Sequence, residues 1–132
     1  MKKICLLFWL SLSCLAHSET RYVVKDNPDA APPYTNWATA AATIQEAVDF
    51  AASNDTIWVT NGVYDTGGRT ANGALTNRVA IDRPVIVRSV NGPEVTIIEG
   101  AGPAGDAAIR CVHLGSNAAL IGFTRGTKQM QK

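Results

Sequence analysis

The chain has 132 residues, with 12 Lys and Arg against 11 Asp and Glu and a formal net charge of +1. That balance lacks the basic surface expected of a nucleic-acid-binding protein, so we expect no nucleic-acid partner. The length fits one small domain. No apolar run reaches the about 20 residues that a membrane-spanning helix needs, so we expect no transmembrane segment.

The first 18 residues have the pattern of a secretory signal peptide. Lys2 and Lys3 form a positive start, residues 4–12 are apolar, and residues 16–18 (AHS) form a small-x-small cleavage site before Glu19. We therefore expect an exported protein that is secreted or lies at the cell surface, in the periplasm or outside the cell.

Two of the three cysteines, Cys5 and Cys14, leave with this segment. The exported part keeps only Cys111 and forms no internal disulfide, so packing alone must hold the fold. Cys14 could instead be lipidated, but Ser11 stands where a bacterial lipidation motif usually has Leu. Cys111 itself is expected to be a small buried hydrophobe.

The predicted elements begin with a β-like run over residues 21–25, followed by a loop rich in Asp and Pro. One helix follows, because Thr43 and Glu46 have the spacing of a capping box. Its apolar face is predicted to contain Ile44, Ala47, Val48 and Ala51, with Gln45, Glu46 and Asp49 turned away. A helix of under three turns is marginal in water and must lie on an apolar surface.

A series of short β-rich runs then continues almost to the end of the chain. Each run has four to six residues rich in Val and Ile, and turn residues separate them. They cover residues 56–60, 78–82, 85–89, 95–99, 109–114 and 119–123. Residues 65–77 are predicted to be a surface loop. Hairpins or a solenoid of parallel coils would both fit this series, and scarce two-residue turns favour the solenoid.

The order TIQEAV, DTIWVTNGVY, RPVIVRSVNGPEVTIIEG, AIRCVHL and ALIGFT resembles the N-terminal region of secreted bacterial right-handed parallel β-helix proteins of the pectin-lyase-like superfamily. The resemblance covers residues 22–124, with Asn54 where that family usually has Gly. It implies an all-β right-handed parallel β-helix, with the helix as an N-terminal cap and the first one to two coils after it.

The family continues for many coils after the step that reads GFT here, whereas this chain passes into a basic tail over residues 125–132, which we expect to be disordered. The sequence therefore predicts a signal peptide over 1–18, a cap and first coils over 19–124, and a truncated solenoid. An exposed terminal coil would offer strand edges for self-association.

Two motifs have simpler explanations than a cofactor site. Residues 100–105 (GAGPAG) match a dinucleotide-binding pattern, but a β-rich run follows instead of a helix, which favours a turn. Cys111 and His113 share a strand face and would suit zinc, yet no third ligand is near, so a packed or surface histidine is favoured.

Acidic residues near strand ends are the candidates for calcium: Asp82, Glu94, Glu99 and Asp106, with a second group at residues 26–29. No two of the first four share a tight spacing, so solvated charge is the favoured interpretation. Asx turns explain the second group. Calcium is implied only for intact relatives, and we expect no cofactor here.

Trp37, Trp58, Tyr34 and Tyr64 gather on both sides of the helix. They are expected either to seal the junction between helix and first strand, which we favour, or to stack on sugar rings, with Trp37, Trp58 and Tyr64 as the stacking candidates.

No catalytic constellation is present, so we assign no catalytic residue and expect no catalysis from this chain as it stands. The expected function is polysaccharide binding or a structural role at the cell surface. The alternatives are the first piece of a polysaccharide lyase or hydrolase, and an adhesin.

Overall fold

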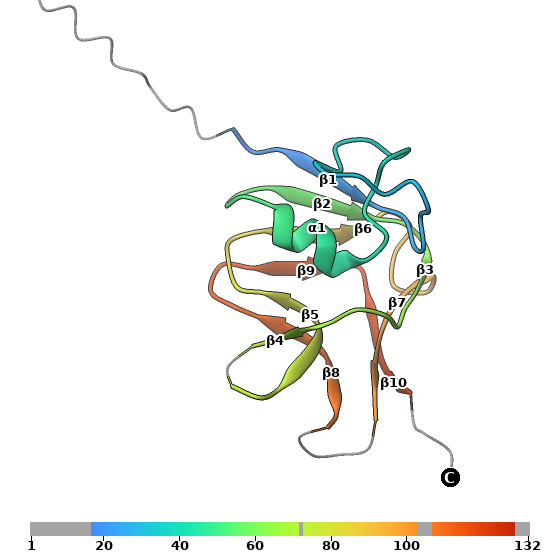
Figure 1. Ribbon diagram of the computed structural model, residues 1–132, viewed down its shortest axis with the longest axis vertical. Coiled ribbons are helices and arrows are strands. Elements are labelled where there is room, and N and C mark those ends of the chain that lie inside the picture. Colours follow the sequence, from blue (N-terminus) through green and yellow to red (C-terminus); the bar gives the residue numbers. More distant parts are fainter. Residues whose placement is uncertain (1–16, 72, 103–106, 129–132) are drawn as a thin grey trace, which may run out of the picture.

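The computed structural model describes residues 17–71, 73–102 and 107–128. Most of the predicted signal peptide, residues 1–16, and one calcium candidate, Asp106, lie outside these ranges. The described part forms one short helix and ten strands (Figure 1). In chain order they are β1 (Thr20–Val23), α1 (Ile44–Phe50), β2 (Thr56–Val59), β3 (Gly62–Tyr64), β4 (Arg69–Thr70), β5 (Thr76–Ile81), β6 (Ile86–Ser89), β7 (Thr96–Ala101), β8 (Ile109–Leu114), β9 (Ala119–Ile121) and β10 (Thr124–Lys128).

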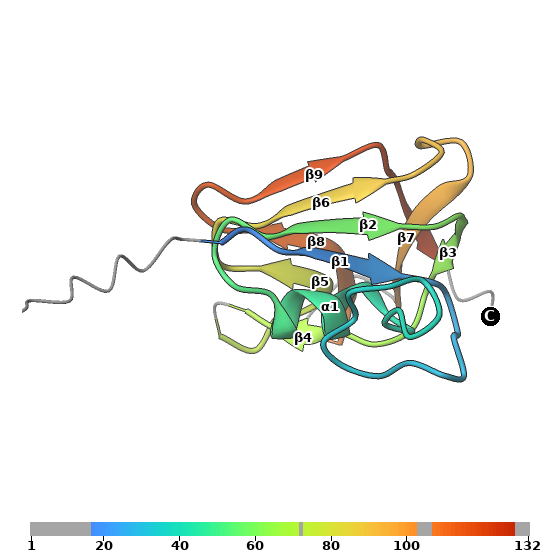
Figure 2. The same cartoon turned by 90° about the horizontal axis from the view of Figure 1, so that it is seen from above.

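The strands form two sheets. Four of them pair in the order β1-β2-β6-β9, and every pair is parallel; we call this the parallel sheet (Figure 2). The other has the order β10-β7-β8-β5-β4, with β3 also pairing with β7; we call it the mixed sheet. Its β10–β7, β3–β7 and β5–β8 pairs are parallel, whereas β7–β8 and β4–β5 are antiparallel.

The predicted right-handed parallel β-helix is therefore wrong, although the chain is predominantly β. A solenoid of that kind has only parallel pairing between its coils, and the mixed sheet contains two antiparallel pairs. The β4–β5 pair lies where the sequence predicts a surface loop over residues 65–77. Short β-rich runs between turns reveal where strands begin but not in which direction each one pairs.

The C-terminal boundary also differs from the prediction. Strand β10 extends to Lys128 and pairs with β7, so residues 125–128 are not a disordered tail. Two side-chain contacts flank this pairing: the Thr124 hydroxyl donates to Pro93 O (2.6 Å), and Cys111 Sγ donates to Gly126 O (2.9 Å). The β fold thus continues past the predicted limit at residue 124.

Helix α1 begins as the sequence predicts. Thr43 accepts from the amide of Glu46 (3.3 Å), and the Glu46 carboxylate accepts from the amide of Thr43 (3.0 Å), so both halves of the capping box are present. The helix packs against β5, β1 and β2. Its predicted apolar face, Ile44, Ala47, Val48 and Ala51, is buried, but Gln45, predicted to face away, is also buried (6% exposed).

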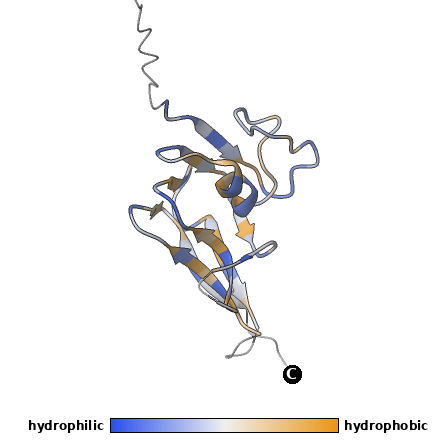
Figure 3. Ribbon diagram, turned by 60° about the vertical axis from the view of Figure 1, so that its left-hand side comes forward, coloured by the Kyte–Doolittle hydropathy of each residue, from blue (hydrophilic) through white to orange (hydrophobic). Residues whose placement is uncertain are grey.

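The core lies between the two sheets and under α1, and apolar residues gather in the strands while the loops are more polar (Figure 3). Fully buried branched side chains fill it: Val23, Val48, Ile57, Val59, Val79, Ile81, Val85, Val87 and Ile98. Burial is less complete toward β8 and β9, where Val112 and Leu120 are only partly buried. The end of the core nearest α1 is therefore the better shielded one.

Candidate functional site

The outer face of the parallel sheet brings aromatic residues into one row. Side chains alternate between the two faces of a strand. Val23, Ile57 and Val87 point into the core, so the intervening residues point outward. The register pairs Tyr22 with Trp58, and Trp58 with Arg88.

A loop residue extends this row beyond the edge of the sheet. The ring of Trp37 lies 4.3 Å from that of Tyr22, centroid to centroid, at 53°. Trp37 is 44% exposed, and the local turn is fixed by Asn36, whose Oδ1 accepts from the amide of Thr39 (2.9 Å). At the other side, the Arg88 guanidinium lies 5.4 Å from the Trp58 ring centroid. We call Trp37, Tyr22, Trp58 and Arg88 the aromatic row.

The geometry of the aromatic row suits a ligand that lies along an open surface. Neighbouring strands are about 4.8 Å apart, so consecutive members form a continuous strip rather than a closed pocket. The remaining outward positions of these strands are uncharged: Thr20, Thr56, Ile86, Ala119 and Ile121. Arg88 is thus the one charge at the outward positions of the four strands. Aromatic faces, hydroxyls and one multidentate donor are groups that contact the apolar and polar sides of a sugar ring.

The structure separates the three predicted stacking residues. Trp37 and Trp58 belong to the aromatic row, whereas Tyr64 is buried (4% exposed) and its hydroxyl donates to Thr60 O (2.9 Å). Burial raises the pKa of the Tyr64 phenol. Tyr64 therefore cannot stack on a ligand, and that prediction is wrong.

The interpretation that the sequence favours, a seal at the helix, describes Tyr34 and Tyr64. Tyr34 packs on the core and lies edge-on to Phe50, with ring centroids 5.8 Å apart. Burial also raises the pKa of the Tyr34 phenol. Tyr34 and Tyr64 thus close the core, while the two tryptophans face outward.

Sequence reasoning missed Tyr22 and Arg88. Arg21 and Val23 lie on either side of Tyr22 in the strand, so the sequence does indicate that Tyr22 lies on the opposite face from both. Nothing local indicates, however, that its strand lies beside β2 or that β6 follows on the far side. The aromatic row depends on the pairing of strands distant in sequence.

The remaining candidates are dispersed. Among the described residues, no three His, Cys, Asp or Glu side chains lie close enough together to hold a metal ion. Asp82 lies 3.5 Å from Arg83, Nε to Oδ1. Cys111 donates to a backbone carbonyl, as described above, and no zinc ligand set surrounds it within the described part of the chain.

The glycine-rich segment has a structural explanation. Gly100 lies in β7, and a Cβ there would be 2.3 Å from the backbone oxygen of Ile109. Strand β8, not a helix, follows from Ile109. Gly100 therefore permits two strands to approach closely, and the helix required for a dinucleotide phosphate is replaced by a strand.

A scan against protein-family models, a search of curated proteins and a search of solved structures each found no match. Within the described residues, no helix is both long and apolar enough to cross a membrane. The aromatic row is therefore the feature from which a function can be inferred.

Proposed function

We propose that the chain is an exported protein that binds a polysaccharide along the outer face of the parallel sheet. The observation that carries this proposal is the register of β1, β2 and β6, which aligns Tyr22, Trp58 and Arg88, with Trp37 packed against Tyr22 at one end. The signal-peptide pattern of residues 1–18 supports export.

The shape of the face favours an extended polymer over a small molecule. Small ligands bind in concave sites that bury most of their surface. The outer face of a sheet is open, so a ligand must gain affinity from several contacts along a line. A chain of sugar rings provides repeated apolar faces for Trp37, Tyr22 and Trp58, and hydroxyls that accept hydrogen bonds from Arg88.

Binding is tested on a panel of soluble polysaccharides by affinity gel electrophoresis and by quenching of tryptophan emission. We expect Trp58→Ala and Trp37→Ala each to weaken binding about tenfold, which corresponds to about 1.4 kcal/mol of lost stacking. Trp58→Phe, which keeps a ring, should lose much less. Val63→Ala is the matched control, because Val63 is exposed but lies on β3 of the mixed sheet.

Two results would overturn the proposal. One is that no polysaccharide of the panel retards the unsubstituted protein. The other is that the Trp58→Ala protein binds as the unsubstituted protein does while its urea midpoint shows that it is folded.

A second candidate function is self-association, favoured by the difference between the two edges of the parallel sheet. The edge of β1 is covered: Tyr22 N donates to Tyr34 O (2.8 Å), and Ala41 N donates to Tyr22 O (2.9 Å). At the opposite edge, β9 has β6 as its partner on one side and none on the other within the described residues. Its sequence has no charge or Pro to block pairing.

We propose that a second copy pairs with β9 through this edge. Sedimentation velocity over a range of concentrations should show a dimer that Ile121→Lys reduces. Ile86→Lys is the control, because Ile86 lies on the same face but on the interior strand β6. A monomer at every concentration would contradict self-association.

A further inference from the structure

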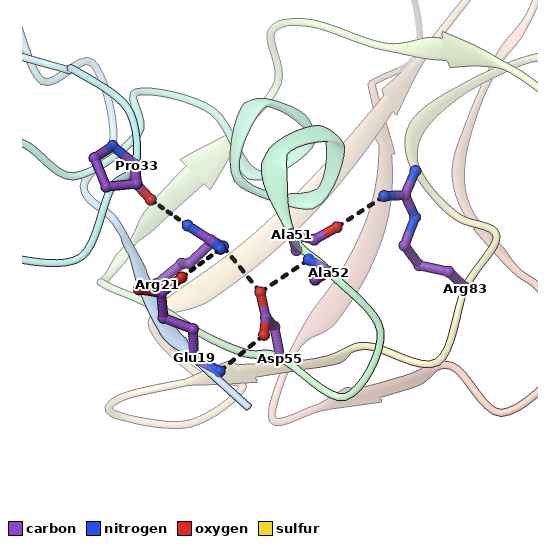
Figure 4. A network of polar contacts seen from close by, with 7 residues as sticks. All are labelled: Glu19, Arg21, Pro33, Ala51, Ala52, Asp55 and Arg83. Atoms are coloured by element: carbon purple, nitrogen blue, oxygen red, sulfur yellow. Dashed lines mark hydrogen bonds and ion pairs between the residues drawn. The ribbon is translucent and has the colours of Figure 1, made fainter. Parts of the chain in front are cut away.

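The carboxylate of Asp55 lies in the interior where β1 begins, α1 ends and β2 begins (Figure 4). Its side chain is fully buried (0% exposed). Oδ2 accepts from Arg21 Nε (3.0 Å) and from the amide of Ala52 (2.9 Å). Oδ1 accepts from the backbone nitrogen of Glu19 (2.8 Å). Among the described residues this nitrogen is the single donor to Oδ1.

The charges around Asp55 do not balance. Arg21, also buried, donates through Nη2 to the Glu19 carboxylate (2.8 Å) and through Nη1 to Pro33 O (2.6 Å). Arg83, drawn in the same view, donates to Ala51 O (2.7 Å) and lies beside Asp82 (3.5 Å), not beside Asp55. Two carboxylates, those of Asp55 and Glu19, thus share one guanidinium, which leaves one negative charge in excess.

Among the described residues, Glu19 is also the first that takes part in a hydrogen bond or a strand pairing. His17 and Ser18 are exposed, and every hydrogen bond and strand pairing in the described structure involves residues from Glu19 onward. The small-x-small cleavage pattern of residues 16–18 ends directly before Glu19. Removal of residues 1–18 therefore breaks none of the described contacts.

We infer that the Ser18–Glu19 bond is a processing site, and that its hydrolysis creates an α-ammonium group at Glu19 that pairs with the buried Asp55 carboxylate. Water adds across the amide: its hydroxyl goes to the Ser18 carbonyl carbon and a hydrogen to the Glu19 nitrogen. Proton transfer then leaves a carboxylate on the released leader and an ammonium on the mature chain. The enzyme required is a signal-type peptidase, which uses only water as co-reactant.

The new positive charge lies beside the carboxylates of Asp55 and Glu19, which carry the excess negative charge. A neutral amide donor becomes a cation 2.8 Å from Oδ1, and the group of Asp55, Arg21, Glu19 carboxylate and Glu19 ammonium becomes neutral. Hydrogen bonds between charged groups are stronger than those between neutral groups, and the difference is largest where water is excluded. Processing is thereby coupled to stability of the mature fold.

The sign of the pH dependence follows from this pairing. A free α-amino group has a pKa of about 7.7–8.0 in the unfolded chain. Pairing with Asp55 raises the pKa of this amine in the folded state. The added stability is therefore fully present below about pH 7.7, and it is lost as the pH rises through the raised folded-state value.

The first test is the N-terminus of the exported protein. The full chain is expressed in a secreting bacterium, and intact mass and terminal peptide are measured by mass spectrometry. We expect a chain beginning at Glu19. A mature N-terminus at any other residue would overturn the inference.

The second test compares three chains with different N-termini: one beginning at Glu19, one beginning at Ser18, and one beginning at Nα-acetylated Glu19. The Ser18 chain has the same net charge but keeps an amide at Glu19, so it is the matched control. At pH 6 we expect the folding equilibrium constant of the first to exceed the other two about tenfold, the difference between a charged and a neutral hydrogen bond. The difference should vanish by about pH 10.

The substitution Asp55→Asn, made in the first and third chains, isolates the partner of the ammonium group. Because this change removes the negative charge, the effect of acetylation on the urea midpoint should disappear. If the substituted chains do not fold, the pH series of the three unsubstituted chains decides alone. Equal stability of those three chains at pH 6, or a difference that does not change with pH, would overturn the inference.

Discussion

The side chain of Gln45 clamps the backbone of Ala80. Gln45 Oε1 accepts from Ala80 N (2.7 Å), and Gln45 Nε2 donates to Ala80 O (3.2 Å). The amide Nε2 also donates to Asp49 Oδ1 (2.7 Å) one turn later in α1. Helix α1 is thus joined to β5 by the polar groups of both elements as well as by apolar packing.

Loss of this clamp should destabilise the protein. Gln45→Met keeps the size of the side chain but leaves the Ala80 amide and carbonyl unpaired in the interior. We expect the free energy of unfolding to fall by about 1–3 kcal/mol for each buried group left unpaired. The measurement is urea denaturation followed by circular dichroism.

Glu46→Gln is the control for this change, because Gln retains an acceptor for the capping box and Glu46 is exposed. It should change stability by less than about 0.5 kcal/mol. Equal effects of the two substitutions would show that the clamp contributes nothing specific.

The buried pair of Arg21 and Asp55 should matter far more than a surface pair. In the chain that retains residues 1–18, where the Glu19 nitrogen is a neutral amide, Arg21→Met leaves the fully buried Asp55 carboxylate without a cation, so we expect a loss of about 3–5 kcal/mol. The control is Arg69→Met, because the Arg69–Asp49 pair (2.6 Å) is half exposed. That change should cost less than about 1 kcal/mol. Similar urea midpoints for the two variants would contradict this prediction.

Tyr64 should make stability depend on alkaline pH. Because burial raises the pKa of the phenol in the folded state, the folded protein disfavours the ionised form. Stability from this group is fully present below the unfolded value of about 10 and falls as the pH rises through the folded value. Tyr64→Phe should lower stability at pH 8 by about 1 kcal/mol, through loss of the hydrogen bond to Thr60 O.

The measurement is urea denaturation of both proteins between pH 8 and pH 11. The advantage of the unsubstituted protein over the Phe variant should shrink above about pH 10. Tyr34, whose pKa is also raised, is present in both proteins and cancels in the comparison. A difference that stays constant over this range would refute the prediction.

Gly100 should tolerate no side chain. Gly100→Ala places a Cβ against the backbone of Ile109. This clash can be relieved only if β7 moves away from β8. We expect a loss of about 1–3 kcal/mol from this overpacking. Gly126→Ala on β10 is the matched control, since the nearest atom to its added Cβ is 3.9 Å away. Thermal unfolding of both variants distinguishes the two sites, and equal midpoints would count against the close contact.

Local features of the fold could be predicted from the sequence, because neighbouring residues determine them. Thr43 and Glu46 predict the start of α1 through their spacing, and the Val- and Ile-rich runs predict most strands. Gln45 was not predictable as buried, because the backbone that it contacts lies in β5. For a related reason the sequence leaves Tyr64 open between sealing the core and stacking on a ligand, since its burial depends on strands that are distant in the sequence.

The candidate site shows the same limit. Trp37 and Trp58 stand out by residue type alone, whereas Tyr22 and Arg88 join them only through strand register. Register and pairing direction are set by the whole buried surface and the turns, not by one segment. The predicted solenoid is wrong for the same reason, because it requires parallel pairs where the mixed sheet has antiparallel ones.

The strand order of the parallel sheet follows the order of synthesis. Strand β2 joins β1, β6 joins β2, and β9 joins β6. When the chain emerges N-terminus first from a ribosome or an export channel, each of these later strands therefore has a partner that emerged before it. In the mixed sheet, β3 must wait for β7, its one partner among the described strands. The sheet that carries the aromatic row is thus the part of the molecule that can assemble vectorially.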